Sequence, residues 1–263
     1  MVPLVRRFTR AKIAFNNADL HFQRELRAAF VGDGSGTEKA VETRDRELAI
    51  MREVDAVLSY NETEHSVIAS HNLRLDNVFK CPWVLQDRRS AVKFAERHGI
   101  AFLGGFNHLP NREAMKYFVA DIMPLLRAAN TGIRLHVYGS NVTPEIEALA
   151  CDDVVIEGFV EDLSEVFDTC RVFVAPLLSG AGIKGKVLES IAHGVPTVLT
   201  PIAAEGTGLV HRHSALIVND PQSWANALTE LYRDEGVWND VADNAHLLVE
   251  SNYGLSNGLE AMT

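Results

Sequence analysis

The sequence predicts an α/β protein whose second half is a Rossmann-like parallel sheet domain and whose first α/β domain is incomplete. Three observations support this fold class. Short apolar runs alternate with helical patterns from residue 100 to residue 231. Four of these runs end at glycine or proline, which predicts a ligand crevice along the carboxyl edge of the sheet. Residues 1–90 contain only two or three strand patterns, too few for a doubly wound domain of roughly 100–150 residues.

Local signals divide the second half into strands and helices. The expected strands are 100–103, 134–138, 154–156, 171–175, 195–199 and 214–218. A helix is expected to begin at Asn111, because asparagine caps helix N-termini. Asp220 and Pro221 start another helix, which runs through Arg233. An acidic helix over about 237–251 follows it.

The first half has fewer elements. Strands are expected at 11–15 and 56–59, and helices at 19–30, 43–53 and 62–70. An unpaired strand edge is a liability in a sheet. We therefore expect the strand at 11–15 to need neighbours that this chain does not supply.

Composition argues against several classes of function. Of the 263 residues 47% are hydrophobic, yet no apolar run approaches the roughly 20 residues of a membrane span. The formal net charge of −10 argues against nucleic acid as a partner, because binding to phosphate backbones requires a basic face. The three cysteines are an odd number without metal-ligand spacing, which fits free thiols in a reducing cytoplasm.

The beginning of the chain is basic. It lacks the apolar core and the cleavage site of a signal peptide. The basic residues are Arg6, Arg7, Arg10 and Lys12. They allow peripheral contact with an anionic membrane, and a solvated basic surface is the alternative. The expected location is the cytoplasm, with membrane association left open.

The stretch from 171 to 200 carries the strongest sign of a ligand site. Three glycines let its backbone approach a ligand closely: Gly180, Gly182 and Gly185. A helix begins near Lys184, and Lys184 and Lys186 place positive charge at the end where the helix dipole disfavours it. Cations kept at a helix N-terminus indicate an anionic partner, and phosphate is the first choice.

Two simpler interpretations compete with a phosphate site. A glycine-rich loop with two lysines also occurs as an ordinary connection between a strand and a helix. Lys186 and Glu189 lie three positions apart, so they also fit a surface pair contributing about 0.2–0.5 kcal/mol to the helix.

The order of residues in this stretch resembles a known motif. Gly-x-Gly-x-Lys-x-Lys-Val-Leu-Glu at 180–189, followed by Ala-x-Gly-x-Pro at 192–196, is similar to the nucleotide-sugar motif of GT-B glycosyltransferases of the group 1, or family 4, type. Gly-Gly-Phe-x-x-x-Pro-Asn at 104–111 and Gly-Phe-Val-Glu-Asp-Leu at 158–163 match the same enzymes in order and interval. The resemblance implies a GT-B-like fold.

The resemblance also implies roles for individual residues. The lysine region, Lys184 and Lys186, would hold the donor diphosphate, and Glu189 the ribose. The remaining candidates for donor binding are Gly104, Gly105, Phe159, Val160, Gly180, Gly182, Glu205 and Gly206. Each has a plainer alternative: strand-end turns for Gly104 and Gly105, core packing for Phe159 and Val160, and an ordinary loop for Glu205 and Gly206.

This chain departs from the family pattern in two places of the donor site. Ala181 stands where many relatives carry the first glutamate of a Glu-x₇-Glu pair. An Arg-x₄-Lys pair that others use against the phosphates is absent, since Asn107 and Asn111 occupy that loop. Lys184 and Lys186 are the candidates to compensate.

The first half is similar to the end of the acceptor-side domain of these enzymes. Asp19 and His21 fit a His-Asp-x-His turn, with Ala18 in place of the first histidine, and 55–64 resembles Asp-Ala-Val-x-x-x-Ser-x-x-Glu. Asp19 and His21 are therefore candidate active-site residues. The alternative is that Asp19 caps a helix and His21 lies on its polar face.

These matches divide the chain into three parts and predict a function. The parts are a partial acceptor-side domain (1–90), a nucleotide-sugar-binding domain (91–235) and a closing helix that crosses back to the first domain (236–263). The resemblance implies a retaining transfer of a sugar from a UDP- or GDP-sugar to a glycan or lipid-linked acceptor. No Asp-x-Asp occurs, so no metal clamp for the diphosphate and no further cofactor are expected.

Two other functions compete with an active transferase. The chain could be a truncated, non-catalytic nucleotide-sugar-binding module that works with a partner segment completing its first domain. A sugar-nucleotide epimerase of the same two-domain fold is the other, although its catalytic residues have no recognisable counterpart in the sequence.

Overall fold

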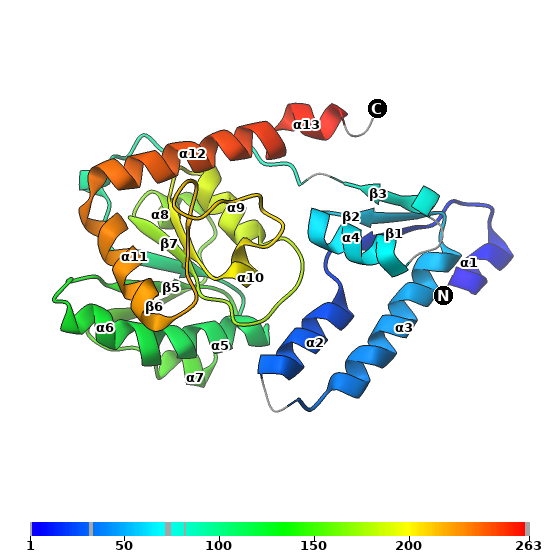
Figure 1. Cartoon of the computed structure of the whole chain (residues 1–263), viewed down its shortest axis with the longest axis horizontal. Helices are drawn as coiled ribbons and strands as arrows, with labels where there is room; N and C mark the ends of the chain where they lie inside the picture. Colours follow the sequence, from blue (N-terminus) through cyan, green and yellow to red (C-terminus); the bar gives the residue numbers. More distant parts are fainter. Residues whose placement is uncertain (1, 32–33, 72–74, 82, 261–263) are drawn as a thin grey trace.

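The structure, a computed structural model, describes residues 2–31, 34–71, 75–81 and 83–260. Two α/β bodies lie next to each other, and the C-terminal helices run across the second body toward the first (Figure 1). Each body has its own hydrophobic core. None of the described helices combines the length and the apolar composition that a bilayer span requires.

The first body is a parallel three-stranded sheet, in the order β1-β2-β3, with helices packed beside it (Figure 1). Its elements are α1 (Val2–Phe8), β1 (Ala14–Asn17), α2 (His21–Val31), α3 (Thr37–Glu53), β2 (Ala56–Ser59), α4 (Glu62–His71), the 3₁₀ turn η1 (Leu75–Asn77) and β3 (Val78–Lys80). A small cluster forms the core: Leu20, Phe22, Leu48, Met51, Val54, Val57 and Ile68. Strand β1 lies at an edge of this sheet.

The second body is a parallel six-stranded sheet in the order β6-β5-β4-β7-β8-β9. The first half of this unit is the 3₁₀ turn η2 (Phe94–Glu96), β4 (Ile100–Leu103), α5 (Leu109–Tyr117), the π turn η3 (Phe118–Ile122), α6 (Met123–Ala128), β5 (Leu135–Tyr138), α7 (Pro144–Glu147) and β6 (Val154–Gly158). The strand order reverses between β4 and β7, which is the point where doubly wound sheets open a ligand crevice.

The chain then continues outward on the other side of the switch point. These elements are α8 (Ser164–Phe167), β7 (Val172–Ala175), α9 (Gly185–Ala192), β8 (Thr197–Leu199), α10 (Pro201–Ala204), β9 (Leu216–Ile217), α11 (Pro221–Arg233), α12 (Glu235–Tyr253) and α13 (Leu255–Glu260). The predicted strand at 214–218 is shorter than expected. The predicted helix through Arg233 is present, and the Asp220 carboxylate caps it by accepting the Ser223 N–H at 2.9 Å.

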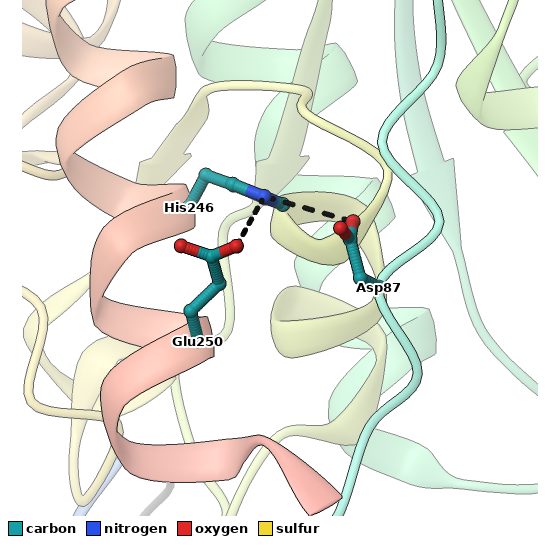
Figure 2. Close-up of side chains that lie close together, drawn as sticks. All are labelled: Asp87, His246 and Glu250. Carbon is teal, nitrogen blue, oxygen red and sulfur yellow. Dashed lines mark ion pairs between the residues drawn. The ribbon is translucent and has the colours of Figure 1, made fainter.

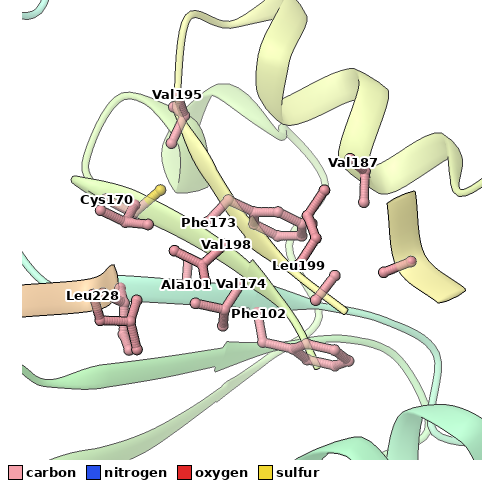
Figure 3. Packing of buried hydrophobic residues seen from close by; sticks show 14 of the residues in the cluster. Ala101, Phe102, Cys170, Phe173, Val174, Val187, Val195, Val198, Leu199 and Leu228 are labelled. Atoms are coloured by element: carbon pink, nitrogen blue, oxygen red, sulfur yellow. The ribbon is translucent and has the colours of Figure 1, made fainter. Parts of the chain in front are cut away.

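The central strands are buried on both faces, as expected for a parallel sheet between helices. All four residues of β7 are buried, and so are all three of β8. Val187 of α9 lies over one face of the sheet and Leu228 of α11 lies at the other (Figure 3). Each large apolar side chain buried in this way contributes about 1.5–3 kcal/mol. The loops that follow β4 and β7 therefore start from well-packed strands.

The start of α5 differs from the sequence prediction. The helix begins at Leu109, not Asn111, and has Pro110 in its first turn, where the fixed φ of proline suits a helix start. The side chain of Asn111 caps nothing. The side-chain amide of Asn111 instead donates to the carbonyl of Gly105 at 2.8 Å. This hydrogen bond holds the loop after β4.

The linker after β3 lies along the C-terminal helix α12. The Leu85 N–H donates to the Tyr253 carbonyl at 2.8 Å, and the Ser90 N–H donates to the His193 carbonyl at 3.2 Å. The Tyr253 hydroxyl donates to the Thr207 carbonyl at 3.0 Å. Linker, closing helix and the loop after α10 are thus connected by hydrogen bonds.

Part of the basic N-terminal stretch has a partner within the domain. Arg6 and Lys12 form ion pairs with Asp55 at 2.7 and 3.4 Å. The Ile13 N–H, followed by Arg6, lowers the pKa of Asp55 to about 2. Two of the four basic residues, Arg6 and Lys12, therefore pair with a carboxylate of the same domain.

Substituting Gly139 by alanine should destabilise the second domain strongly. A Cβ at this position would lie 1.8 Å from the Gly104 carbonyl oxygen, which is backbone and cannot rotate away. We expect a loss at or above the upper end of the roughly 1–3 kcal/mol that overpacking costs. Gly132→Ala is the control, because no atom lies within 4 Å of its Cβ and only its positive φ is strained, at about 1–2 kcal/mol. Equal urea midpoints for the two variants would contradict the close approach.

Candidate active site

The candidate site lies at the carboxyl edge of the sheet, where the order of β4 and β7 reverses. The loop after β4 brings Gly104 and Gly105 to this edge. The loop after β7 carries Gly180, Gly182 and Lys184 and leads into α9. Two of the three sequence motifs therefore meet on neighbouring strands.

Lys186, in the first turn of α9, contacts one residue of α5 and one of β4. Its ammonium donates to the Asn111 side-chain oxygen at 2.8 Å and lies 4.2 Å from the centre of the Phe102 ring. Burial, and next the charge of Lys184, lowers the pKa of Lys186 to about 7. Among the residues that the structure describes, no carboxylate ion-pairs with this ammonium. It is a desolvated cation that lacks a counter-ion.

Lys184 is enclosed by its own loop. The residue is the N-cap of α9, and its ammonium donates to the carbonyls of Ala181 and Gly182 at 2.9 and 2.5 Å. Burial lowers its pKa to about 8, opposed by the charge of Glu205. The two lysines therefore differ: one stabilises the loop conformation, and the other lies beside Asn111 and Phe102.

Asn111, in α5, contacts both the loop after β4 and the first turn of α9. A Cβ on Gly104 would lie 2.8 Å from the Asn111 side chain, so glycine is needed for this contact. Asn111 donates to Gly105 and accepts from Lys186, each at 2.8 Å. The sequence identified Asn111 as a helix cap, as the end of the 104–111 motif and as a departure from the Arg-x₄-Lys pattern. Its contact with Lys186 was missed because the two residues lie 75 positions apart.

Glu64 connects the glycine loop to the first domain and was missed by the sequence analysis. One carboxylate oxygen accepts the N–H groups of Leu20 and Gly182, both at 2.8 Å, and the other accepts from Asn61 at 3.2 Å. The residue is 2% exposed, and burial raises the pKa of its carboxyl group. Glu64 is the last residue of the 55–64 motif, which was a signal for its importance.

A second contact between the domains joins α2 to the loops of the second domain. Arg27 forms a bidentate pair with the Glu205 carboxylate at 2.5 and 2.7 Å, and donates to the Gly180 carbonyl at 2.9 Å. Gly206 lies against Asn61, since a Cβ on this glycine would be 2.7 Å from that of Asn61. Glu205, Gly180 and Gly206 thus lie at the domain junction.

Of the two candidates of the first domain, Asp19 lies next to the glycine loop and His21 contacts Asp19. A Cβ on Gly182 would lie 2.8 Å from the Cβ of Asp19. Asp19 pairs with Arg24 and lies 3.3 Å from the His21 ring nitrogen Nε2. The alternative role of Asp19 as a helix cap is not observed, because Glu47 of α3 accepts the His21 and Phe22 N–H groups at 3.1 Å each.

The remaining candidates differ in exposure. Phe159, after β6, is 74% exposed, and Val160 packs at the margin of the large core. The Glu189 side chain is partly buried one turn after Lys186 and makes no hydrogen bond or ion pair within the described ranges. Its carboxylate is available to accept hydrogen bonds from a ligand.

This architecture, two α/β domains meeting at the carboxyl edge of a parallel sheet, is the GT-B glycosyltransferase fold. The chain belongs to the family of group 1 glycosyl transferases, whose family model matches residues 97–234. The predicted fold class and family resemblance are both confirmed. A curated relative, an uncharacterised 44.6 kDa protein in the cps region of Klebsiella pneumoniae, is 24% identical over 163 residues, covering 59% of this chain and 42% of the relative.

Solved structures support the same fold. A TarM variant from S. aureus, in complex with fondaparinux, α-GlcNAc-glycerol and UDP, has a TM-score of 0.78 at 13% identity, covering 96% of this chain and 50% of TarM. Anabaena HepE with UDP-glucose scores 0.72 at 10% identity, with 98% and 73% covered. Sucrose-phosphate synthase from Thermosynechococcus elongatus scores 0.75 at 17% identity, with 98% and 68% covered. The chain spans about half the length of TarM and less than half that of the curated relative.

Replacing Lys186 by methionine should stabilise the ligand-free protein, more at pH 6 than at pH 9. Its pKa is about 7 when folded and 10.5 ordinarily, so between these values the unfolded chain binds more protons and stability rises with pH. Below pH 7 the folded protein carries the buried charge in full, and methionine removes that cost.

Thermal unfolding midpoints at the two pH values measure this effect. Lys116→Met is the matched control, because that side chain is 51% exposed and pairs at the surface with Glu145. If Lys186→Met and Lys116→Met shift the midpoint alike at both pH values, the Lys186 ammonium is not desolvated.

Proposed function

We propose that this chain binds the diphosphate of a UDP- or GDP-sugar at Lys186 and takes part in transferring the sugar to a glycan or lipid-linked acceptor. The observation that carries the proposal is the desolvated Lys186 ammonium without a carboxylate partner. Burying an unpaired charge is costly, and an anion beside it recovers that cost. Membership of the group 1 glycosyl transferases supports a nucleoside diphosphate sugar as this anion.

The surroundings of Lys186 suit a diphosphate. The ammonium lies at the N-terminal end of α9, where backbone N–H groups and the helix dipole favour negative charge. The acidic groups that act on the neighbouring Lys184 have partners of their own, because Arg27 pairs with Glu205 and the N–H groups of Leu20 and Gly182 donate to Glu64. Glu189, one turn further along α9, is the proposed acceptor for ribose hydroxyls. UDP is the first nucleotide to test, since both HepE and TarM have been crystallised with it.

The proposed chemistry uses these groups at the leaving diphosphate. As the bond between the anomeric carbon and the diphosphate breaks, its electrons go to the diphosphate oxygen, and Lys186 stabilises the growing charge. The acceptor oxygen forms the new bond to the same carbon, and its proton goes to the leaving diphosphate. We propose that configuration is retained and that no metal is needed at the diphosphate. Asp19, beside Gly182, and His21, beside Asp19, are the candidates for orienting sugar and acceptor.

A second candidate function is a non-catalytic, nucleotide-sugar-binding module of a larger glycosyltransferase. The favouring observation is that the chain covers 42% of its curated relative and 50% of TarM. The first sheet has three strands, with β1 at its edge. Both candidate functions predict nucleotide binding, and only the first predicts turnover.

Calorimetric titration with UDP, GDP and ADP tests the shared part of the proposal. We expect one of them to bind, and Lys186→Ala to weaken that binding about 10-fold or more, since a hydrogen bond to a charged group contributes about 1.5–3 kcal/mol. Glu189→Ala should weaken it in the same direction. The surface variant Lys116→Ala is the control and should bind as wild type does. Failure of all three nucleotides to bind, or unchanged binding by Lys186→Ala, would overturn the proposal.

The affinity for the nucleotide should fall as the pH rises from 7 to 9. Lys186 must hold its proton to bind the diphosphate, and its pKa of about 7 means that the free protein loses this proton over that range. Lys186→Arg keeps its charge and should show a flatter profile. Profiles with the same slope for lysine and arginine would place the titrating group elsewhere.

Donor turnover separates the two candidate functions. Incubation of the chain with the bound UDP- or GDP-sugar, with and without acceptor oligosaccharide extracts, is followed by product analysis. A glycoside product supports the transferase, and an epimerised sugar nucleotide would indicate an epimerase. Binding without either product supports the module.

A further inference from the structure

We infer that the linker and the closing helix form a binding site for a divalent transition-metal ion of the zinc class, built from Asp87, His246 and Glu250. Asp87 lies on the linker, and His246 and Glu250 lie one turn apart on α12 (Figure 2). The donor crevice uses none of these residues, so the inference is independent of the proposed function.

The distances fit metal ligands better than they fit hydrogen bonds. The His246 Nε2 atom lies 3.6 Å from an Asp87 oxygen and 3.7 Å from a Glu250 oxygen. These separations exceed ordinary hydrogen-bond lengths. Ligand atoms about 2.0–2.2 Å from a tetrahedral zinc ion lie roughly 3.4 Å from each other. The three ligand atoms all lie within 4.8 Å of one another, and both carboxylates are more than half exposed and can rotate to close the third separation.

The histidine supplies an independent observation. His246 is 5% exposed, and its Nε2 atom points toward the two carboxylates (Figure 2) without making a hydrogen bond within the described chain. A buried polar atom that is aimed at a gap between ligand atoms indicates a missing partner. That partner would lie between the three side chains, at Nε2 and not at the other ring nitrogen.

Charge and position agree with a divalent cation. With a neutral imidazole the group carries two negative charges, and no lysine or arginine of the described ranges pairs with either carboxylate. The Arg89 N–H donates to Asp87 at 3.0 Å and orients that carboxylate, as outer groups do for metal ligands. The three residues line a surface pocket of about 700 Å³, which leaves room for water on the open side of the ion.

A metal at this place would fasten the linker to α12. The linker already contacts this helix through the Arg89–Asp243 ion pair and the Leu85–Tyr253 hydrogen bond. Because the linker joins the two domains and α12 packs on α9, the ion would restrict how the first domain moves relative to the donor site.

Titration of the EDTA-treated, full-length chain with ZnCl₂ tests the inference by calorimetry and thermal unfolding. We expect one zinc ion per chain and a higher unfolding midpoint in its presence. Asp87→Asn and Glu250→Gln remove one ligand each at exposed positions and should weaken binding at least about 10-fold. Asp240→Asn removes the same charge from an exposed position of α12 that makes no hydrogen bond or ion pair with the described linker residues, and should bind zinc as wild type does.

Two results would overturn the metal site. One is the absence of zinc binding by the wild-type chain, in which case the cluster is an imidazolium ion-paired with two carboxylates. The other is zinc binding that Asp87→Asn and Glu250→Gln leave unchanged, which would place the ion at other residues.

Discussion

The Lys186 ammonium is partly buried and has no carboxylate partner among the described residues, and the rest of the candidate site depends on that constraint. Packing of α9 against β7 and β8 fixes the lysine backbone, while Asn111 and Phe102 hold the head group. A desolvated charge lowers the stability of the free protein. Burial of apolar side chains in the large core offsets this cost. A bound diphosphate would restore the missing charge, which couples donor binding to stability.

The acidic groups that act on the neighbouring Lys184 have partners of their own. Arg27 of the first domain holds Glu205, and the N–H groups of Leu20 and Gly182 hold Glu64. Both contacts also bring the glycine loop of the second domain against the first. Domain contact and donor electrostatics are therefore linked: separating the domains would leave Glu205 without its arginine, close to Lys184. The first domain thus contributes to the electrostatic field at the candidate donor site.

Sequence patterns predicted the regular elements of the second domain well, since β4 and α11 have the expected bounds. These elements carry local signals: apolar runs ended by glycine, and an Asp-Pro helix start. The predicted start of α5 at Asn111 was wrong, because the helix begins at Leu109 with Pro110 in its first turn. The Asn111 side chain instead hydrogen-bonds to Gly105 and Lys186. Glu64 and Arg27 were missed because their partners lie 118 and 178 positions away, and no local pattern reports such distances. Family motifs nevertheless identified Lys186 and the glycine loop, whose residues the fold brings to the expected edge.

The most direct measurement is a pH titration of Lys186, in which NMR of its side-chain Cε resonance reports the protonation of the amine with and without UDP. We expect an apparent pKa of about 7 in the free protein, and a higher pKa when the diphosphate binds because its negative charge favours the ammonium. A free-protein pKa near the ordinary value of 10.5, or a value that saturating UDP leaves unchanged, would contradict this expectation.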